Sequence, residues 1–280
     1  MFIKLLQDQF ISKLTPIYDE GEAQQLFLFC LSELEGKTRI DLAMNPELTT
    51  VKLAQWQTTL DKLVQQKPIQ HIFGKAYFYG YTFEVNEHTL IPRPETEELV
   101  EWIIASVPLN QPIRILDIGT GSGCIGLTLA KELPQSQVAL LDISSEALQV
   151  AQRNAKALDV KVDFIQQDIL ALKQLSSSYD IIVSNPPYIR QLEKVEIKSN
   201  VMEYEPHTAL FVDDSDPLIF YRKIAELAVE NLKPQGQLFY EINQYLGQEM
   251  LELLTTIGFK NTELRRDMMQ NDRMTKSVVL

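Results

Sequence analysis

The chain has 280 residues, of which 45% are hydrophobic, and its formal net charge is -12. This length is enough for two domains with a sizeable core, and the apolar content is typical of a globular protein. So acidic a chain repels phosphate backbones unless a basic patch overrides its charge. The best candidate patch, Arg265-Arg266, is too short, so we expect no direct nucleic-acid binding.

The positions of the cysteines and histidines argue against a disulfide-stabilised protein and against a metal-binding protein. Cys30 and Cys124 lie far apart and form no disulfide framework, which predicts a reducing compartment, the cytoplasm. The histidines are scattered without metal-ligand spacing, so we expect no metal. No apolar stretch approaches the length of about 18 residues that a membrane span requires.

Residues 1–75 are predicted to form a helical domain. Leu53, Trp56 and Leu60 recur at steps of three and four, which places them on one helical face. This domain either positions a partner or caps the rest of the chain, and both interpretations stay open. Residues 76–91 then become aromatic and β-branched, which predicts a hairpin linker.

The next segment contains two prolines, Pro92 and Pro94, that hold it extended. Arg93 and Glu95 therefore project in predictable directions. The segment is either a rigid connector or a wall over a functional site, and in the second case both residues are substrate-binding candidates. A helix is predicted after it, at 96–107.

From residue 112 onward, strand patterns alternate with helix patterns. Strands are predicted at 113–117, 137–142, 161–165, 179–183 and 236–242, with two more near 259–265 and 274–280. Helices are predicted between them at 124–133, 144–158 and 216–232. This alternation predicts an α/β domain over residues 92–280 with a doubly wound, mostly parallel sheet.

A glycine-rich turn follows the first of these strands. It consists of Gly119, Thr120, Gly121, Ser122 and Gly123, and it lets a ligand approach the backbone closely. Asp142 ends the second strand and can accept both ribose hydroxyls of an adenosine cofactor. Asp168, after the third strand, is either an adenine ligand or an exposed loop acid. Cys124, beside the turn, is more typical of a small buried residue than of a nucleophile.

The fourth strand ends in Asn-Pro-Pro-Tyr, because proline cannot donate to a sheet. The candidate catalytic and substrate-binding residues are Asn185, Pro186, Pro187 and Tyr188, and Asn185 is a cofactor-binding candidate as well. The Asn185 side-chain carbonyl and the following backbone carbonyls can hold both hydrogens of an NH₂ group, while Tyr188 offers a wall for a flat amide or base. A simple strand-terminating turn is the alternative.

Two cofactors fit the glycine turn and Asp142, a nicotinamide dinucleotide and S-adenosylmethionine. Hydride transfer needs a proton-transferring group near the substrate, and no motif in the sequence indicates such a group. Methyl transfer needs an oriented nitrogen, which Asn185 can provide. The pattern therefore favours S-adenosylmethionine.

These residues together resemble the HemK/PrmC family of protein-glutamine methyltransferases, which modify peptide chain release factors. The resemblance spans nearly the whole chain, and Ile-Pro-Arg-Pro-Glu-Thr-Glu at 91–97 is its most specific part. Asn-Pro-Pro-Tyr alone is shared with methyltransferases of adenine and guanine amino groups. The chain departs from the family pattern at Asn243, at Asn271 and in the acidic stretch 213–216, where glycines are usual.

The resemblance implies a class I S-adenosylmethionine-dependent fold with a seven-stranded sheet whose last strand is antiparallel, an N-terminal helical bundle and a hairpin linker. It implies that residues 119–123 bind the methionine part of the cofactor, Asp142 the ribose, and Asp168 with Ile169 the adenine. The implied substrate is the glutamine of the Gly-Gly-Gln loop in release factors, held by residues 185–188, and the implied process is translation termination.

Two rival functions remain at this stage. A methyltransferase of nucleic-acid amino groups would use the same Asn-Pro-Pro-Tyr motif to hold an NH₂ group, but the net charge of this chain argues against that function. A non-catalytic, cofactor-binding adaptor would be expected to show a decayed glycine turn or a decayed Asn185 site, and both motifs are intact.

Overall fold

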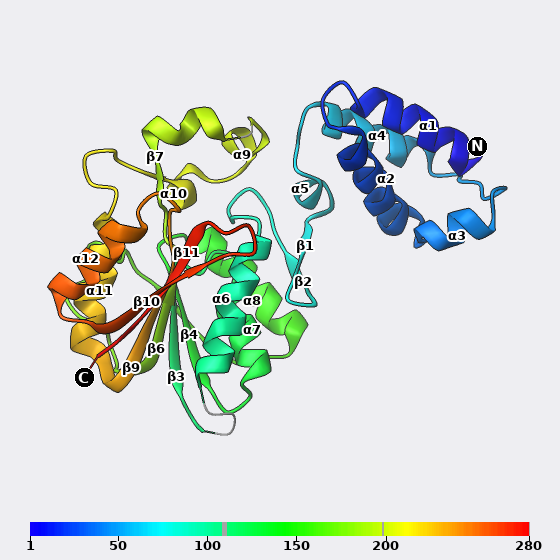
Figure 1. Ribbon diagram of the computed structural model, residues 1–280. Coiled ribbons are helices and arrows are strands. Elements are labelled where there is room, and N and C mark those ends of the chain that lie inside the picture. The colour runs from blue at the N-terminus through cyan, green and yellow to red at the C-terminus, as the bar shows by residue number, and fades with distance from the viewer. Residues whose placement is uncertain (108–110, 198, 280) are drawn as a thin grey trace. The chain divides into compact units, whose positions relative to one another are not determined.

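The computed structural model describes residues 1–107, 111–197 and 199–279 (Figure 1). These residues divide into two compact units, one of residues 1–74 with 199–204 and the other of residues 75–197 with 205–279. None of the helices in these described ranges is both long and apolar enough to cross a membrane.

The first unit is helical. Its helices are α1 (Ile3–Leu14), α2 (Glu20–Glu35), α3 (Arg39–Met44), α4 (Leu53–Val64), α5 (Ile69–Phe73) and α9 (Ser199–Tyr204). Asp19 caps α2 by accepting the Glu22 backbone N–H at 2.8 Å. The rings of Phe10, Phe27 and Trp56 form the centre of its core, with centroids 5.3 to 5.8 Å apart.

The second unit begins with a hairpin and continues into a seven-stranded sheet. The hairpin strands are β1 (Lys75–Phe78) and β2 (Tyr81–Glu84). In spatial order, the sheet contains β10 (Lys260–Arg266), β11 (Asp272–Val278), β9 (Leu232–Glu241), β6 (Tyr179–Ser184), β3 (Arg114–Ile118), β4 (Gln137–Asp142) and β5 (Asp163–Gln166). All pairs are parallel except those of β11, the last strand, which is antiparallel to both neighbours.

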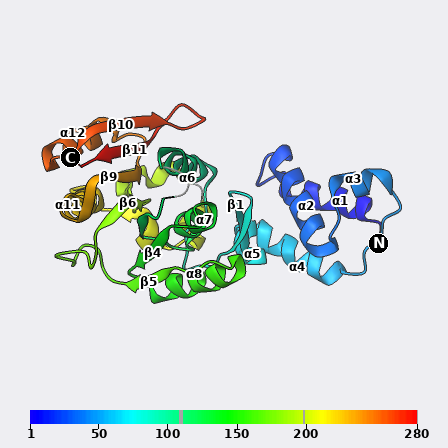
Figure 2. The same ribbon diagram turned by 90° about the horizontal axis from the view of Figure 1, so that it is seen from below.

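Helices cover both faces of this sheet (Figure 2). One face carries α6 (Pro94–Ser106), α7 (Cys124–Glu132) and α8 (Ser145–Leu158), and the other carries α11 (Ile219–Asn231) and α12 (Gly247–Ile257). Because side chains alternate along a strand, Ile181 packs under the first group and Ile182 under the second. This two-sided burial explains the continuous apolar run of β6.

The chain reverses its direction across the sheet at β3. It runs outward from β3 through β4 to β5 and then returns to β6 on the other side of β3. Ligands of open α/β sheets bind at such a switch point, outside the carboxyl ends of the strands. The glycine turn, Asp142 and Asn185 all follow strands at this edge.

The predicted fold class is confirmed, and one segment departs from the prediction. Residues 189–212 have no predicted elements, yet the structure contains β7 (Ile189–Arg190), η1 (Gln191–Glu196), α9, α10 (His207–Leu210) and β8 (Phe211–Val212) there. Each element is six residues or shorter, and so short an element shows no readable hydrophobic period.

Candidate active site

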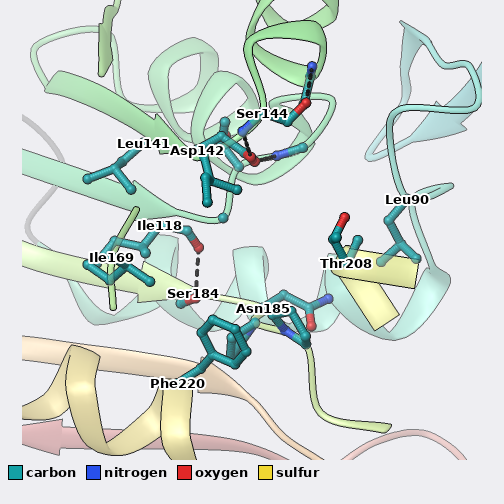
Figure 3. A pocket seen from close by; sticks show the side chains of 18 of the residues that line it. Leu90, Ile118, Leu141, Asp142, Ser144, Ile169, Ser184, Asn185, Thr208 and Phe220 are labelled. Atoms are coloured by element: carbon teal, nitrogen blue, oxygen red, sulfur yellow. Dashed lines mark hydrogen bonds between the residues drawn. The ribbon is translucent and has the colours of Figure 1, made fainter. Parts of the chain in front are cut away.

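A cavity of about 490 Å³ opens at the carboxyl ends of β3, β4 and β6. Asp142 and Ser144 lie at one side of it, and Asn185 lies at the other (Figure 3). Two strand spacings separate β4 from β6, which corresponds to about 10 Å. A ligand that reaches both sides must therefore be elongated.

The glycine turn forms part of the cavity wall. Gly119 and Gly121 have φ values of +72° and +55°, in the left-handed region that favours glycine. A Cβ atom built on either residue meets nothing within 4 Å, and both residues line the cavity. The turn is therefore an open cradle against which a ligand can approach the backbone.

Asp117, at the end of β3, holds this turn from beneath. Its Oδ2 accepts the Thr120 hydroxyl at 2.6 Å and the Gly126 backbone N–H at 3.0 Å. The side chain is fully buried, and this burial raises its pKa from 3.8 to about 6. This residue was not predicted from the sequence, although a carboxylate two residues before a glycine turn, near the end of a strand, was a usable signal.

Asp142 is fixed at the rim by two backbone donors. Its Oδ2 accepts the Gly121 N–H at 2.8 Å, and its Oδ1 accepts the Ser144 N–H at 2.9 Å. Burial raises the pKa of this carboxyl. Each carboxylate oxygen can accept a further hydrogen bond, so the group can also receive two hydroxyls of a ligand.

Part of the cavity near Asp142 is an apolar slot. Ile118, Leu141, Ile169 and Phe220 all line it. Asp168 also lines the cavity, and its Oδ1 accepts the Leu170 N–H at 2.9 Å. Such a slot, bordered by acceptors, suits a flat heterocycle with an amino group. Phe220 was not singled out for this role, because it lies on α11 and nothing local in the sequence places it at the strand ends.

Asn185 lies directly after β6 and is half-buried. The strand end is secured because the Ser184 hydroxyl donates to the Ile118 carbonyl at 2.7 Å. Asn185, Pro186 and Pro187 line the cavity. The Asn185 side-chain amide has no hydrogen-bond partner within the part of the chain that the structure describes, so its oxygen is available to a ligand.

Tyr188 has a different position from these neighbours. It is not among the residues that line the cavity. Its hydroxyl donates to Glu241 Oε1 at 3.2 Å, and its carbonyl accepts the Asn243 side-chain N–H at 3.0 Å. Burial raises the pKa of this phenol well above its usual range. Asn243, a departure from the family pattern, therefore makes a contact with the acceptor motif.

The Pro-Arg-Pro-Glu segment contributes one of its two candidates to the cavity. Arg93 lines it, and its guanidinium is 2.6 Å from Glu205 Oε1. Glu205, whose side chain is 1% exposed, also accepts the Ile91 N–H at 3.0 Å. Glu95 lies in the first turn of α6 and does not line the cavity.

Two further observations concern the thiol at the glycine turn and metal ligands. Cys124 is half-buried and lines the cavity, and desolvation of its thiol raises its pKa to about 12, which favours the protonated thiol at neutral pH and argues against a nucleophilic role. Among residues 1–107, 111–197 and 199–279, no cluster of three or more His, Cys, Asp and Glu side chains could hold a metal ion.

The comparisons with known proteins agree along the chain. Residues 6–74 match the family model described as PrmC N-terminal domain, and residues 99–207 match the methyltransferase small domain. A release factor glutamine methyltransferase of Flavobacterium psychrophilum is 52% identical, with 99% of each chain covered. Another, of Bacteroides thetaiotaomicron, is 42% identical over 93% of this chain and 94% of that protein. This chain belongs to the release factor glutamine methyltransferase family.

A solved structure supports the same fold. A methyltransferase from Pyrococcus furiosus superimposes with a TM-score of 0.53 at 17% identity, covering 79% of this chain and 98% of that one. Together with the strand order, this likeness confirms the class I methyltransferase fold. The resemblance to the HemK/PrmC family drawn from the sequence is confirmed as well.

Proposed function

We propose that this chain transfers a methyl group from S-adenosylmethionine to the side-chain amide nitrogen of the glutamine in the Gly-Gly-Gln loop of peptide chain release factors. The observation that carries the proposal is one cavity that joins the apolar slot and the Asp142 carboxylate to the unpartnered side-chain amide of Asn185. Family membership over nearly the full length supports the choice of substrate.

The cavity fits the proposed cofactor part by part. The open cradle at Gly119 and Gly121 accepts the methionine portion, the fixed Asp142 carboxylate receives the ribose hydroxyls, and Asp168 with Ile169 borders the adenine. Gly123, predicted to share the first role, is not among the residues that line the cavity, and a Cβ atom there would meet Leu127 at 2.7 Å. When bound, S-adenosylmethionine supplies an electrophilic methyl group on a sulfonium. The enzyme's own work is then to orient the acceptor nitrogen.

A carboxamide nitrogen is a poor nucleophile, because its lone pair is delocalised into the carbonyl. We assign Asn185 Oδ1 and the Pro186 carbonyl to the two hydrogens of the substrate amide. Held in this way, the nitrogen is favoured to become pyramidal and to direct its lone pair at the methyl group. Positioning of this kind lowers a barrier by roughly 7–11 kcal/mol in favourable cases. Methyl transfer would form the N–CH3 bond, break the S–CH3 bond and leave S-adenosylhomocysteine, and the proton on the now acidic nitrogen would pass to water.

The remaining predicted substrate residues keep distinct roles in this proposal. Arg93, paired with the buried Glu205, forms part of the cavity wall. Direct substrate contact by Tyr188, Pro187 and Glu95 stays a prediction. The chain also departs from the family pattern at Asn271, which receives no role in the chemistry.

The division of the chain enters the proposal as well. We assign residues 1–75 to a helical domain that positions the release factor, 76–91 to the hairpin linker and 92–280 to the catalytic domain. The compact unit ending at residue 74 supports the first boundary. We assign the reaction to the cytoplasm, where translation terminates, and the free Cys30 and Cys124 fit a reducing compartment.

The test is a competition between substrate classes. The enzyme is incubated with S-adenosylmethionine and an equimolar mixture of release factor, duplex DNA and structured RNA, and tandem mass spectrometry locates the added methyl group. Methylation of the Gly-Gly-Gln glutamine alone is the expected result. Methylation of an adenine or guanine amino group instead would replace the proposal with the nucleic-acid function.

A further inference from the structure

Glu241 is a buried carboxylate behind the acceptor motif that the proposed reaction does not use. It ends β9, the strand beside β6, and is 2% exposed. Burying an ionisable side chain is costly unless hydrogen bonds compensate for lost water. A residue that only filled this core position could be apolar at lower cost, so the groups that its oxygens bind indicate its role.

Each carboxylate oxygen receives a hydroxyl from a different part of the site. Thr96 Oγ1 donates to Oε2 at 2.6 Å, and the Tyr188 hydroxyl donates to Oε1 at 3.2 Å. Thr96 lies on α6 and lines the cavity, while Tyr188 belongs to the acceptor motif after β6. One carboxylate therefore connects a wall of the cavity to the segment that carries Asn185.

The backbone around Glu241 is itself held by hydrogen bonds from buried tyrosines. The Glu241 carbonyl accepts the Tyr221 hydroxyl at 3.2 Å, and the Tyr221 carbonyl accepts the Tyr240 hydroxyl at 2.9 Å. Both tyrosines are fully buried. Asn243, two residues after Glu241, holds the Tyr188 carbonyl at 3.0 Å. The end of β9 thus holds Tyr188 at both its hydroxyl and its backbone.

We propose that Glu241 is a positioning residue, which fixes the acceptor motif at 185–188 against the cavity wall through the hydroxyls of Tyr188 and Thr96. The assignment rests on the proposed function, because it is the Asn185 amide that must be held in place. Glu241 touches neither substrate nor cofactor in this account. Displacement of an acceptor group by about 1 Å can lower turnover by about 100-fold.

The first test is a double-mutant cycle with release factor as substrate. Glu241→Met, which keeps the side chain's length and removes both acceptor oxygens, and Tyr188→Phe are each expected to lower kcat by about 10- to 100-fold, with little change in KM for the release factor or in the Kd of S-adenosylmethionine. Because both changes remove the same link, the double variant is expected to be no slower than the slower single variant. Multiplicative losses, or equal losses of kcat and cofactor affinity, would overturn the assignment.

Threonine variants supply a matched control. Thr96→Val removes the hydroxyl that reaches Glu241, and Thr96→Ser retains it, so the first is expected to lose turnover and the second to recover it. Thr275→Val is the same chemical change at a fully buried threonine on β11 whose hydroxyl has no partner among the described residues. It is expected to leave kcat unchanged, and a loss equal to that of Thr96→Val would indicate a merely structural effect.

Hydrogen–deuterium exchange separates this inference from the proposed function. Glu241→Met is expected to speed exchange of the amides of Tyr188, Ile189 and Arg190, while the unfolding temperature falls little and residues 124–132 of α7 exchange as in the wild type. If wild-type enzyme does not methylate release factor, the proposed function fails. The exchange experiment still tests whether Glu241 holds the acceptor motif, because it needs no substrate. Unchanged exchange at these amides would refute the positioning role.

Discussion

Replacing Asp117 by asparagine tests how the glycine turn is held. The carboxyl is fully buried, and its pKa is raised from 3.8 to about 6. The folded state therefore keeps the proton between these two pH values, whereas the unfolded state releases it. This contribution lowers the free energy of unfolding as pH rises through the window, by about 3 kcal/mol once pH exceeds 6. Asparagine does not titrate, so its own cost is independent of pH.

The predicted observable is a difference between two proteins. Urea unfolding is measured from pH 4 to pH 7.5 in a Trp56→Phe background, so that Trp102 on α6 is the fluorescent reporter. The stability of Asp117→Asn relative to Asp117 is expected to rise by about 2 to 3 kcal/mol over this range. Carboxyls elsewhere cancel in the difference. A difference that stays constant to within about 0.5 kcal/mol would refute the reasoning.

Three further predictions concern the cavity. Gly121→Ala places an alanine at φ +55°, in the left-handed region. This change is expected to lower the free energy of unfolding by about 1–2 kcal/mol and to weaken S-adenosylmethionine binding measured by calorimetry. Unchanged affinity would show that the turn is not part of the cofactor site. Asn185→Ala is expected to lower turnover by about 100-fold or more, while the Kd of the cofactor stays near the wild-type value. Equal losses of turnover and cofactor affinity would contradict the assignment of Asn185 to the acceptor amide. Cys124, with a pKa of about 12, is expected to resist iodoacetamide at pH 8 in the folded protein, and Cys124→Ala to keep its activity; rapid alkylation would contradict the burial argument.

The sequence was sufficient to predict those parts of the site that follow consecutive strands. The glycine turn, Asp142, Asp168 and Asn185 each come at the end of an apolar run, and parallel strands bring such ends to one edge. Their convergence therefore follows from the alternation of strands and helices. The roles assigned to them remain proposals.

Groups that pair across the fold could not be predicted in this way. Glu241 meets Thr96 from 145 positions away, and Glu205 meets Arg93 from 112 positions away. No period or spacing links such pairs, because each depends on how separate elements pack. The position of Tyr188 outside the cavity lining has the same origin, since the strand β9 that holds it comes much later in the chain.

Methyl transfer to a release factor tests the central claim most directly. The enzyme is given labelled S-adenosylmethionine with purified release factor or with a version whose Gly-Gly-Gln glutamine is changed to alanine. Label on the first protein and none on the second is the predicted result. Label on neither, with cofactor binding confirmed by calorimetry, or equal label on both, would contradict the assignment of this glutamine amide as the acceptor.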